Sequence, residues 1–325
     1  MLGKKIVTIG GGTGGFTVNR GLHGYPVHPT AICTVFDSGG STGKLRDEFG
    51  SLPQGDIRRC LLALADDSND TLRALFNHRF ANNGSPLSDH SLGNLLLLAA
   101  EQNWGPVEGI RRVSEVLGVR GEVLPISINN ANVCAELSDG SQVCGEGIID
   151  TRSIDDERTI KRVWLGPAAF ITREAADAII AADLIVFGPG DVYTSIVPNL
   201  LVSGIQDAIK RSKAKVVYVA NIMTKWSETR RFTVADFVET LLSYGVGRDA
   251  FDAVIINTTS PPETLVARYA QEEKSFLVEY SAKIEEQLRG KVREHICGDF
   301  LNQAGVEQGL IRHDSYKLAY TLVQL

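Results

Sequence analysis

Apolar runs of strand character alternate along the chain with segments in which apolar residues recur at helical spacing. The runs cover residues 5–9 (KIVTI), 30–36 (TAICTVF), 182–190 (ADLIVFGPG), 214–224 (AKVVYVANIMT) and 252–258 (DAVIINT). Strands that are continuously apolar are buried on both faces, and strands separated by helices pair in parallel. The pattern therefore predicts an α/β fold with a doubly wound, mainly parallel sheet.

Two regions depart from this alternation. Residues 56–118 contain four helical segments without a clear strand between them, and we expect a helical insertion over one side of the sheet. Within residues 122–165, the segments NVCAEL and QVCGEG flank SDGS, where Asp139-Gly140 favours a hairpin turn. This predicts a small antiparallel β-ribbon. Because the chain has no internal repeat and no low-complexity linker, we expect a single α/β domain over residues 1–325.

Composition and charge narrow the classes of function. The 325 residues are 43% hydrophobic and 22% charged, and the net charge of −6 leaves no basic field for a nucleic acid. No apolar stretch approaches the roughly 20 residues that span a bilayer, so we expect no membrane insertion. The chain enters a strand directly, without a signal-peptide pattern, which favours a cytoplasmic location.

The cysteines are Cys33, Cys60, Cys134, Cys144 and Cys297. Their number is odd and no C-x-x-C pair occurs, so the sequence predicts neither a disulfide framework nor a zinc site. We expect them to be small apolar fillers in a reducing cytoplasm.

The first predicted strand ends in the loop GGGTGG, in which Gly10, Gly12 and Gly15 fit the G-x-G-x-x-G pattern of Rossmann-like dinucleotide sites. Glycines let the backbone approach a ligand, and the N-terminus of the following helix offers N–H groups to a phosphate. Asp37, roughly 20 residues beyond the glycines, lies where a dehydrogenase holds the ribose of NAD. A NAD-binding oxidoreductase is therefore one hypothesis.

A second glycine loop, SGGSTGKLRDEFG, follows Asp37 and does not suit a dehydrogenase. Successive glycines and hydroxyls form an anion-binding concavity, and Lys44 and Arg46 can neutralise a diphosphate. An exposed turn with solvated charges is the alternative. Two anion cradles on adjacent strands favour a nucleoside diphosphate that carries a further substituent.

Further motifs place polar residues where predicted strands end or helices begin. LPQGDIRRCLLAL puts Asp56 and Arg58 at a helix start, where Asp56 can equally serve as an N-cap. DHSLGNLLLLAA puts His90, Ser91 and Asn94 before an apolar helix, where a lone histidine is commonly structural. FGPGDVYTSIVPNLL and NIMT follow two more strands. Because the carboxyl ends of parallel strands share one edge, we expect these groups to converge there.

The motifs supply one set of candidate ligand-binding residues. They are Gly10, Gly11, Gly12, Thr13, Gly14, Asp37, Gly39, Gly40, Ser41, Lys44, Arg46, Asp56, Arg58, His90, Ser91, Asn94, Gly188, Gly190, Tyr193, Thr194, Ser195, Asn221 and Thr224.

Together with the late segment LIRHDSYKLAYTL, these motifs resemble the YvcK-type gluconeogenesis factor family of the CofD-like superfamily, named after 2-phospho-L-lactate transferase. The resemblance implies a cytoplasmic bacterial protein that is required for growth and normal cell shape on gluconeogenic carbon. It implies binding of UDP-sugars such as UDP-N-acetylglucosamine or UDP-glucose, with Arg312 on a phosphate and Tyr269 stacked on the base or sugar. It also implies a homodimer and an unidentified protein partner in cell-envelope regulation.

Three hypotheses follow. The favoured one is a UDP-sugar-binding regulatory factor without catalytic turnover, and we assign no catalytic residue. The second is a Mg²⁺-dependent nucleotide-diphosphate transferase of the phospholactate transferase type, with Asp37 and Asp56 on the metal. The third is the NAD-binding oxidoreductase. The chain has Ser38 where the family usually has a second Asp, and Lys44 where it has Arg, which weakens the expectation of a metal site and of UDP-sugar specificity.

Overall fold

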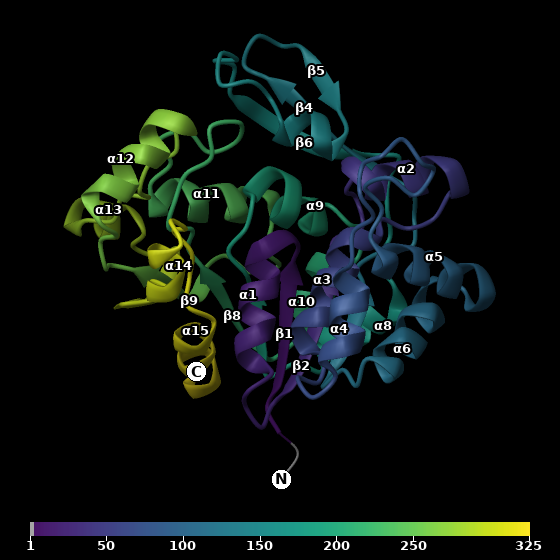
Figure 1. Ribbon diagram of the computed structural model, residues 1–325. Coiled ribbons are helices and arrows are strands. Elements are labelled where there is room, and N and C mark those ends of the chain that lie inside the picture. Colours follow the sequence, from purple (N-terminus) through teal and green to yellow (C-terminus); the bar gives the residue numbers. More distant parts are fainter. Residues whose placement is uncertain (1–2) are drawn as a thin grey trace.

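The computed structural model describes residues 3–325, so residues 1–2 of the expected domain lie outside the described range. Seven parallel strands form the central sheet in the order β10-β9-β8-β7-β1-β2-β3 (Figure 1). They are β1 (Lys5–Gly10), β2 (His28–Cys33), β3 (Glu122–Pro125), β7 (Leu184–Phe187), β8 (Lys215–Val219), β9 (Phe251–Asn257) and β10 (Val292–Gly298). The predicted doubly wound parallel sheet is confirmed.

Both faces of the sheet are buried, as the first strand illustrates. Ile6 belongs to a core cluster shared with α1 (Gly12–Leu22) and α15 (Ser315–Gln324), which pack against each other. Val7 and Ile9 point to the other side, into the large cluster that also contains side chains of α8, α10 and α11. This two-sided burial explains why the central strands are continuously apolar in sequence.

Two edge strands are absent from the predicted set. β10 contains Arg293, Glu294 and His295 and is half-exposed, so it has no continuous apolar run. β3 falls inside the expected 122–165 ribbon, but it pairs in parallel with β2. The expected start of the ribbon at residue 122 is therefore wrong, since residues 122–125 form an edge strand of the main sheet. A strand of four residues is too short for its sequence pattern to indicate which strand it pairs with.

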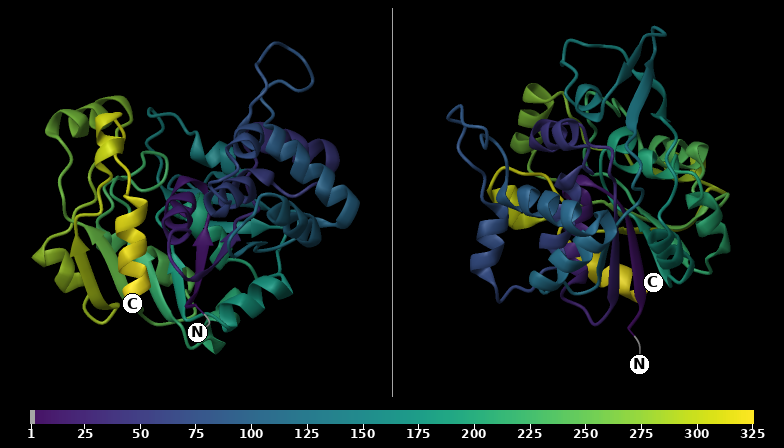
Figure 2. Two further views of the ribbon diagram at one scale, coloured as in Figure 1. Left: turned by 60° about the horizontal axis from the view of Figure 1, so that its bottom comes forward. Right: turned by 90° about the vertical axis from the view of Figure 1, so that its right-hand side faces the viewer.

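The helical insertion has the expected four helices, and Figure 2 shows them beside the sheet. They are α3 (Gln54–Leu64), α4 (Asp70–Asn77), α5 (Leu92–Trp104) and α6 (Pro106–Val116). The second glycine loop is itself the start of a helix, α2 (Gly40–Phe49), and its polar groups therefore have fixed directions.

The antiparallel ribbon stands above the carboxyl edge of the sheet (Figure 1). It consists of β4 (Asn132–Leu137), β5 (Gln142–Cys144) and β6 (Ile160–Gly166) in the order β5-β4-β6. Gly140, at φ +84°, makes the predicted hairpin turn. After β5 the chain enters the short helix α7 (Glu146–Asp150), which returns toward the sheet.

The ribbon also corrects the expectation for the cysteines. Cys134 and Cys144 lie directly opposite each other on β4 and β5 and form a disulfide. The expectation of no disulfide rested on the number of cysteines and the absence of a C-x-x-C pair, whereas the register of the predicted hairpin brings two cysteines at a sequence separation of 10 face to face. Cys33 and Cys60 are buried among apolar residues, as expected, and Cys297 is exposed.

The remaining helical elements complete the two layers around the sheet. They are α8 (Arg173–Ile180), the π-helical turn η1 (Val192–Ile196), α9 (Val197–Leu200), α10 (Ile205–Arg211), α11 (Val234–Tyr244), α12 (Glu263–Glu272), α13 (Ala282–Gln287) and α14 (Gln303–Glu307). None of the helices within residues 3–325 is both long and apolar enough to cross a bilayer.

Candidate functional site

A crevice with two lobes runs along the carboxyl ends of β1, β7 and β8. The first, which we name the Arg312 lobe, has a volume of about 420 Å³ and is lined by residues that include Gly190, Asn221, Tyr269 and Arg312. The second, the carboxylate lobe, has a volume of about 370 Å³. Its acidic lining residues are Asp37, Asp56, Glu146, Asp150 and Asp191. Gly12, Thr13, Asp191 and Ser195 line both lobes, so the crevice is continuous.

The crevice brings together most of the residues predicted from the sequence. Those that line it are Gly11, Gly12, Thr13, Gly14, Asp37, Gly39, Gly40, Ser41, Asp56, Arg58, Asn94, Gly190, Thr194, Ser195, Asn221, Tyr269 and Arg312. The predicted residues that do not line it are Gly10, Lys44, Arg46, His90, Ser91, Gly188, Tyr193 and Thr224.

The first glycine loop is held by tight packing at the junction of the lobes. Gly12, at φ +66°, begins α1, and its N–H donates to Asp56 Oδ1 at 2.8 Å. A Cβ on Gly14 would lie 1.5 Å from the carbonyl oxygen of Pro189, so the loops after β1 and β7 touch along their backbones. The Gly12 amide is therefore used inside the protein, while the amides of Thr13 and Gly14 have no partner within the helix.

The Asp56 carboxylate holds the first glycine loop in place by accepting the Gly12 N–H. It lies inside the first turn of α3, whose N-cap is Pro53, so the interpretation of Asp56 as an N-cap is wrong. Burial raises the pKa of Asp56 to about 6, although Arg59 and the Gly12 amide act in the opposite direction. Arg59 Nη1 lies 3.5 Å from Asp56 Oδ1 and itself lines the carboxylate lobe.

Glu146, at the start of α7, faces Asp37 across the carboxylate lobe. Burial and then the nearby charge of Asp37 raise the pKa of Glu146 well above its usual range, so this carboxyl is protonated at neutral pH. Asp37 Oδ1 accepts the Gly39 N–H at 2.7 Å, which fixes its orientation. The pair therefore presents about one negative charge to a ligand.

The second glycine loop is tied to α5 by buried hydrogen bonds. Ser41 Oγ lies 2.8 Å from His90 Nδ1, and Asn94 Nδ2 donates to Ser41 Oγ at 3.4 Å. Arg58 Nε donates to Asn94 Oδ1 at 3.1 Å. Ser91 is the N-cap of α5 and accepts the Asn94 N–H. His90 and Ser91 thus position the residues that line the lobe.

Lys44 and Arg46 are not where the diphosphate hypothesis requires them. Lys44 is exposed on α2, outside the crevice. Arg46 is buried and donates to Asn130 Oδ1 at 2.8 Å and to Asn132 Oδ1 at 2.6 Å, so it anchors the ribbon. Sequence spacing placed both cations near the glycines, but the direction of α2 turns them away.

The cations that do line the carboxylate lobe are Arg58, Arg59 and Arg79. Arg79 belongs to no motif and was missed, because it comes from the connection between α4 and α5. Burial lowers the pKa of Arg58 to about 10, which leaves it charged at neutral pH. This lobe therefore combines carboxylates with guanidinium groups.

The loops after β7 and β8 contribute to both the crevice and the core. Asn221 Nδ2 donates to the Gly190 carbonyl at 2.9 Å and so fixes the rim of the Arg312 lobe. Tyr193 is buried in edge-to-face contact with aromatic neighbours. Thr224 is buried and accepts the Phe276 N–H at 3.0 Å. The last two residues are structural.

The Arg312 lobe has an exposed cation on a fixed backbone. Within residues 3–325 no carboxylate forms an ion pair with Arg312. The neighbouring Ile311 N–H donates to the Tyr269 hydroxyl at 3.3 Å, which links α12 to this segment. Burial lowers the pKa of His313 to about 4, so it is neutral at physiological pH. A guanidinium without an internal partner is suited to an anionic ligand.

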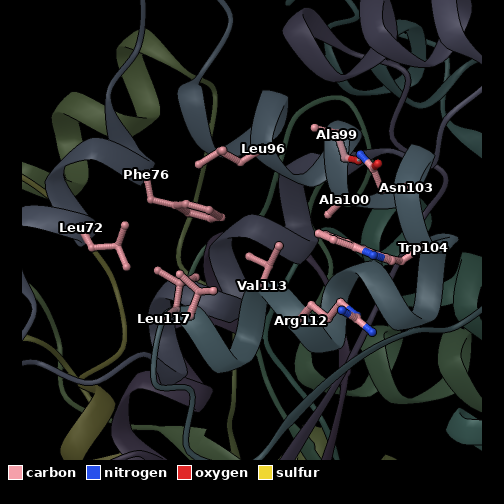
Figure 3. Close-up of a pocket in the computed structure, with 11 residues that line it drawn as sticks. Leu72, Phe76, Leu96, Ala99, Ala100, Asn103, Trp104, Arg112, Val113 and Leu117 are labelled. Carbon is pink, nitrogen blue, oxygen red and sulfur yellow. The ribbon is translucent and has the colours of Figure 1, made fainter.

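Another cavity, of about 260 Å³, lies between α4, α5 and α6, and Figure 3 shows its apolar lining. Phe76, Val113 and Leu117 line it, and Trp104 stacks with the Arg112 guanidinium at its margin. It has few groups that could bind a phosphate or a sugar hydroxyl. A larger cavity, of about 760 Å³, is lined by residues that include Lys5, His28 and Glu122 and lies at the amino ends of the strands, away from the glycine loops. Because ligands of open α/β sheets bind at the carboxyl ends of the strands, the crevice is the candidate functional site.

Comparison with known proteins identifies the family of the chain. Residues 6–300 match the family described as 2-phospho-L-lactate transferase CofD. The chain belongs to the CofD family. Its relatives include proteins named gluconeogenesis factor from Halalkalibacterium halodurans and Bacillus subtilis. The first is 38% identical and the match covers 100% of this chain and 97% of the relative. The second is 40% identical, over 99% of this chain and 98% of the relative.

The fold of this CofD family member also matches a solved structure. A crystal structure of a protein from Bacillus halodurans superposes with a TM-score of 0.90, at 39% sequence identity and over 99% of both chains. The resemblance to the gluconeogenesis factor family is thus confirmed over nearly the whole chain.

Sequence reasoning missed the acidic residues that the CofD family member brings from its ribbon. Glu146 and Asp150 are separated from the glycine loops by about 100 residues and lie in α7, which the sequence grouped with the hairpin. The only available signal was the acidic segment GEGIID directly after the second ribbon strand.

Proposed function

We propose that this CofD family member is a regulatory factor that binds a UDP-sugar and acts in growth and cell morphogenesis under gluconeogenic conditions. The observation that carries the proposal is the continuous crevice, whose two lobes differ in chemistry. The names of the relatives, gluconeogenesis factor, support the physiological part of the proposal.

The two lobes suit the two ends of a nucleotide sugar. Arg312 and Tyr269 offer a cation and an aromatic ring, which suit a phosphate and a base. The carboxylates of the other lobe can accept hydrogen bonds from sugar hydroxyls, and the guanidinium groups of Arg58, Arg59 and Arg79 beside them can contact a phosphate. We expect the diphosphate at the junction of the two lobes, where Thr13, Ser195 and the N-terminus of α1 offer hydroxyl and N–H groups.

The test is a calorimetric titration of the purified protein with UDP-N-acetylglucosamine, UDP-glucose, NAD and GDP. We expect saturable binding of a UDP-sugar and at least about tenfold weaker binding of NAD and GDP. The absence of heat and of thermal stabilisation with both UDP-sugars would overturn the proposal. Tighter binding of NAD would instead favour the oxidoreductase hypothesis.

A second candidate function is supported by the facing carboxyls of Asp37 and Glu146. Together with Asp56 they line one lobe and supply the oxygen ligands that Mg²⁺ prefers. When bound there, Mg²⁺ would neutralise a diphosphate during transfer of a substituent. This candidate is the Mg²⁺-dependent nucleotide-diphosphate transferase.

Titration with and without EDTA separates the two functions. Binding that is lost in EDTA, with a transferred product detected by mass spectrometry, would establish the transferase. Metal-independent binding of a UDP-sugar without any product would support the regulatory factor and reject the transferase.

A further inference from the structure

Three carboxylates from three separate segments meet where the ribbon touches the sheet edge. Asp150 ends α7, Asp191 follows β7, and Glu228 lies in the loop after β8. One oxygen atom of each lies within 4.8 Å of the others. Oxygen atoms on opposite sides of a bound Ca²⁺ are separated by about this distance, because each Ca–O contact is about 2.3–2.6 Å. The cluster therefore has the dimensions of a hard-cation site.

The Lys225 ammonium is the cation of this cluster. Its Nζ donates to Asp191 Oδ2 at 2.8 Å and forms an ion pair with Asp150 as well. The backbone holds it in place, since the Lys225 N–H donates to Thr229 Oγ1 at 3.0 Å and the Thr229 N–H donates back to the Lys225 carbonyl at 2.8 Å. One ammonium therefore joins a ribbon carboxylate to a sheet-edge carboxylate.

Glu228 faces the same cation from the buried side. Its carboxylate accepts the Tyr193 N–H at 2.7 Å and the Thr194 hydroxyl at 2.6 Å, so its orientation is fixed. Burial alone would lower the pKa of Lys225, but the three surrounding carboxylates outweigh it and raise that pKa above its usual range. The ammonium is charged at every physiological pH.

An ordinary ion pair in the same protein looks different. Lys161 Nζ lies 2.7 Å from Glu136, which Arg162 also contacts, so two cations share one carboxylate. At Lys225 the ratio is reversed, with one cation among three carboxyl groups, of which Glu228 has a pKa that burial and the charge of Asp191 raise to about 7. Carboxylates this close repel one another strongly unless a cation lies between them.

We propose that Lys225 is a built-in replacement for a divalent cation, and that a neutral residue at this position turns the Asp150–Asp191–Glu228 cluster into a divalent-metal site. In the wild type the Lys225 ammonium, and not a metal ion, links Asp150 of the ribbon region to Asp191 at the sheet edge. This inference does not depend on the proposed ligand of the crevice.

The experiment titrates Ca²⁺ and Mg²⁺ alone into the full chain by calorimetry, with far-UV circular dichroism as a check of folding. For Lys225→Met we expect one Ca²⁺ site more than in the wild type, at least about tenfold tighter than any site shared by both. Lys161→Met is the matched control and gains no site. Adding Asp191→Asn to Lys225→Met removes the new site.

Metal binding and folding of the Lys225→Met variant either support or overturn the inference. An unchanged stoichiometry in folded Lys225→Met overturns it, as does a new site that survives Asp191→Asn. If Lys225→Met unfolds without metal, millimolar Ca²⁺ restores the circular dichroism spectrum when the inference is correct, and continued unfolding in Ca²⁺ overturns it. Binding at the Asp37 and Glu146 carboxyls appears equally in the wild type and does not change this result.

Discussion

The two lobes of the crevice hold their polar groups in opposite ways. In the Arg312 lobe the cation is exposed and forms no ion pair with any carboxylate of residues 3–325, so its charge is available to a ligand. In the carboxylate lobe Asp56 is buried, burial favours a proton on Glu146, and Lys225 forms ion pairs with Asp150 and Asp191. The guanidinium of Arg312 is thus free to bind a ligand. In the carboxylate lobe, burying several acidic groups together costs free energy, and protons and neighbouring cations of the protein offset that cost.

The largest expected effect concerns the junction on which both lobes depend. Gly14→Ala would place a Cβ 1.5 Å from the Pro189 carbonyl oxygen, so the two loops must separate. We expect the free energy of unfolding to fall by about 3 kcal/mol or more in urea denaturation, with loss of binding in both lobes. Gly188→Ala is the control, because its Cβ meets no atom closer than 3.8 Å. Equal stability of the two variants would refute this account of the junction.

The carboxylate lobe gives a pH dependence of stability. The pKa of Asp56 is raised from 3.8 to about 6, so the folded state holds the proton more tightly than the unfolded state. The stabilisation is fully present below pH 4 and is lost as pH rises through about 6. Relative to Asp56→Asn, the wild type should lose about 3 kcal/mol of unfolding free energy between about pH 3 and pH 8.

Urea denaturation at a series of pH values measures this difference. Asp249→Asn, at an exposed position, is the control and should follow the wild type at every pH. A wild type that gains stability relative to Asp56→Asn as pH rises would show that the sign is wrong.

The Arg312 lobe should respond in affinity and not in stability. Arg312→Ala removes a charged partner of the ligand, so we expect UDP-sugar binding to weaken about 10-fold to 100-fold with little change in melting temperature. Calorimetry measures the affinity. Arg289→Ala, whose side chain is 78% exposed just after the end of α13, should bind as the wild type does. Identical affinity of all three proteins would remove Arg312 from the site.

The smallest effect is expected from Tyr269→Phe. The variant keeps the ring but loses the hydroxyl that accepts the Ile311 N–H at 3.3 Å, so the segment beside Arg312 is held less firmly. We expect about fivefold weaker UDP-sugar binding, equivalent to about 1 kcal/mol. Tyr320→Phe, on an exposed face of α15, serves as the control. A loss as large as that of Arg312→Ala would mean that the hydroxyl contacts the ligand itself.

Local pattern was sufficient to predict the centre of the fold. The apolar runs predicted β1, β2, β7, β8 and β9, because burial on both faces makes a central strand continuously apolar, and the glycine loops after β1, β2 and β7 marked the carboxyl ends of the strands. The edge strands β3 and β10 lack that signal, since one side or one end of each is open to solvent. Their place in the sheet follows only from pairing.

By itself, then, the sequence determined the α/β sheet, the hairpin turn at Gly140, the family and most residues of the crevice, since these depend on short-range pattern and on motifs at strand ends. Tertiary structure alone decided which polar groups face the crevice. It turned Arg46 toward the ribbon, brought Glu146 against Asp37, and placed Lys225 among three carboxyl groups. The physical reason is that helix direction and strand register, which set side-chain orientation, come from contacts between residues far apart in the chain.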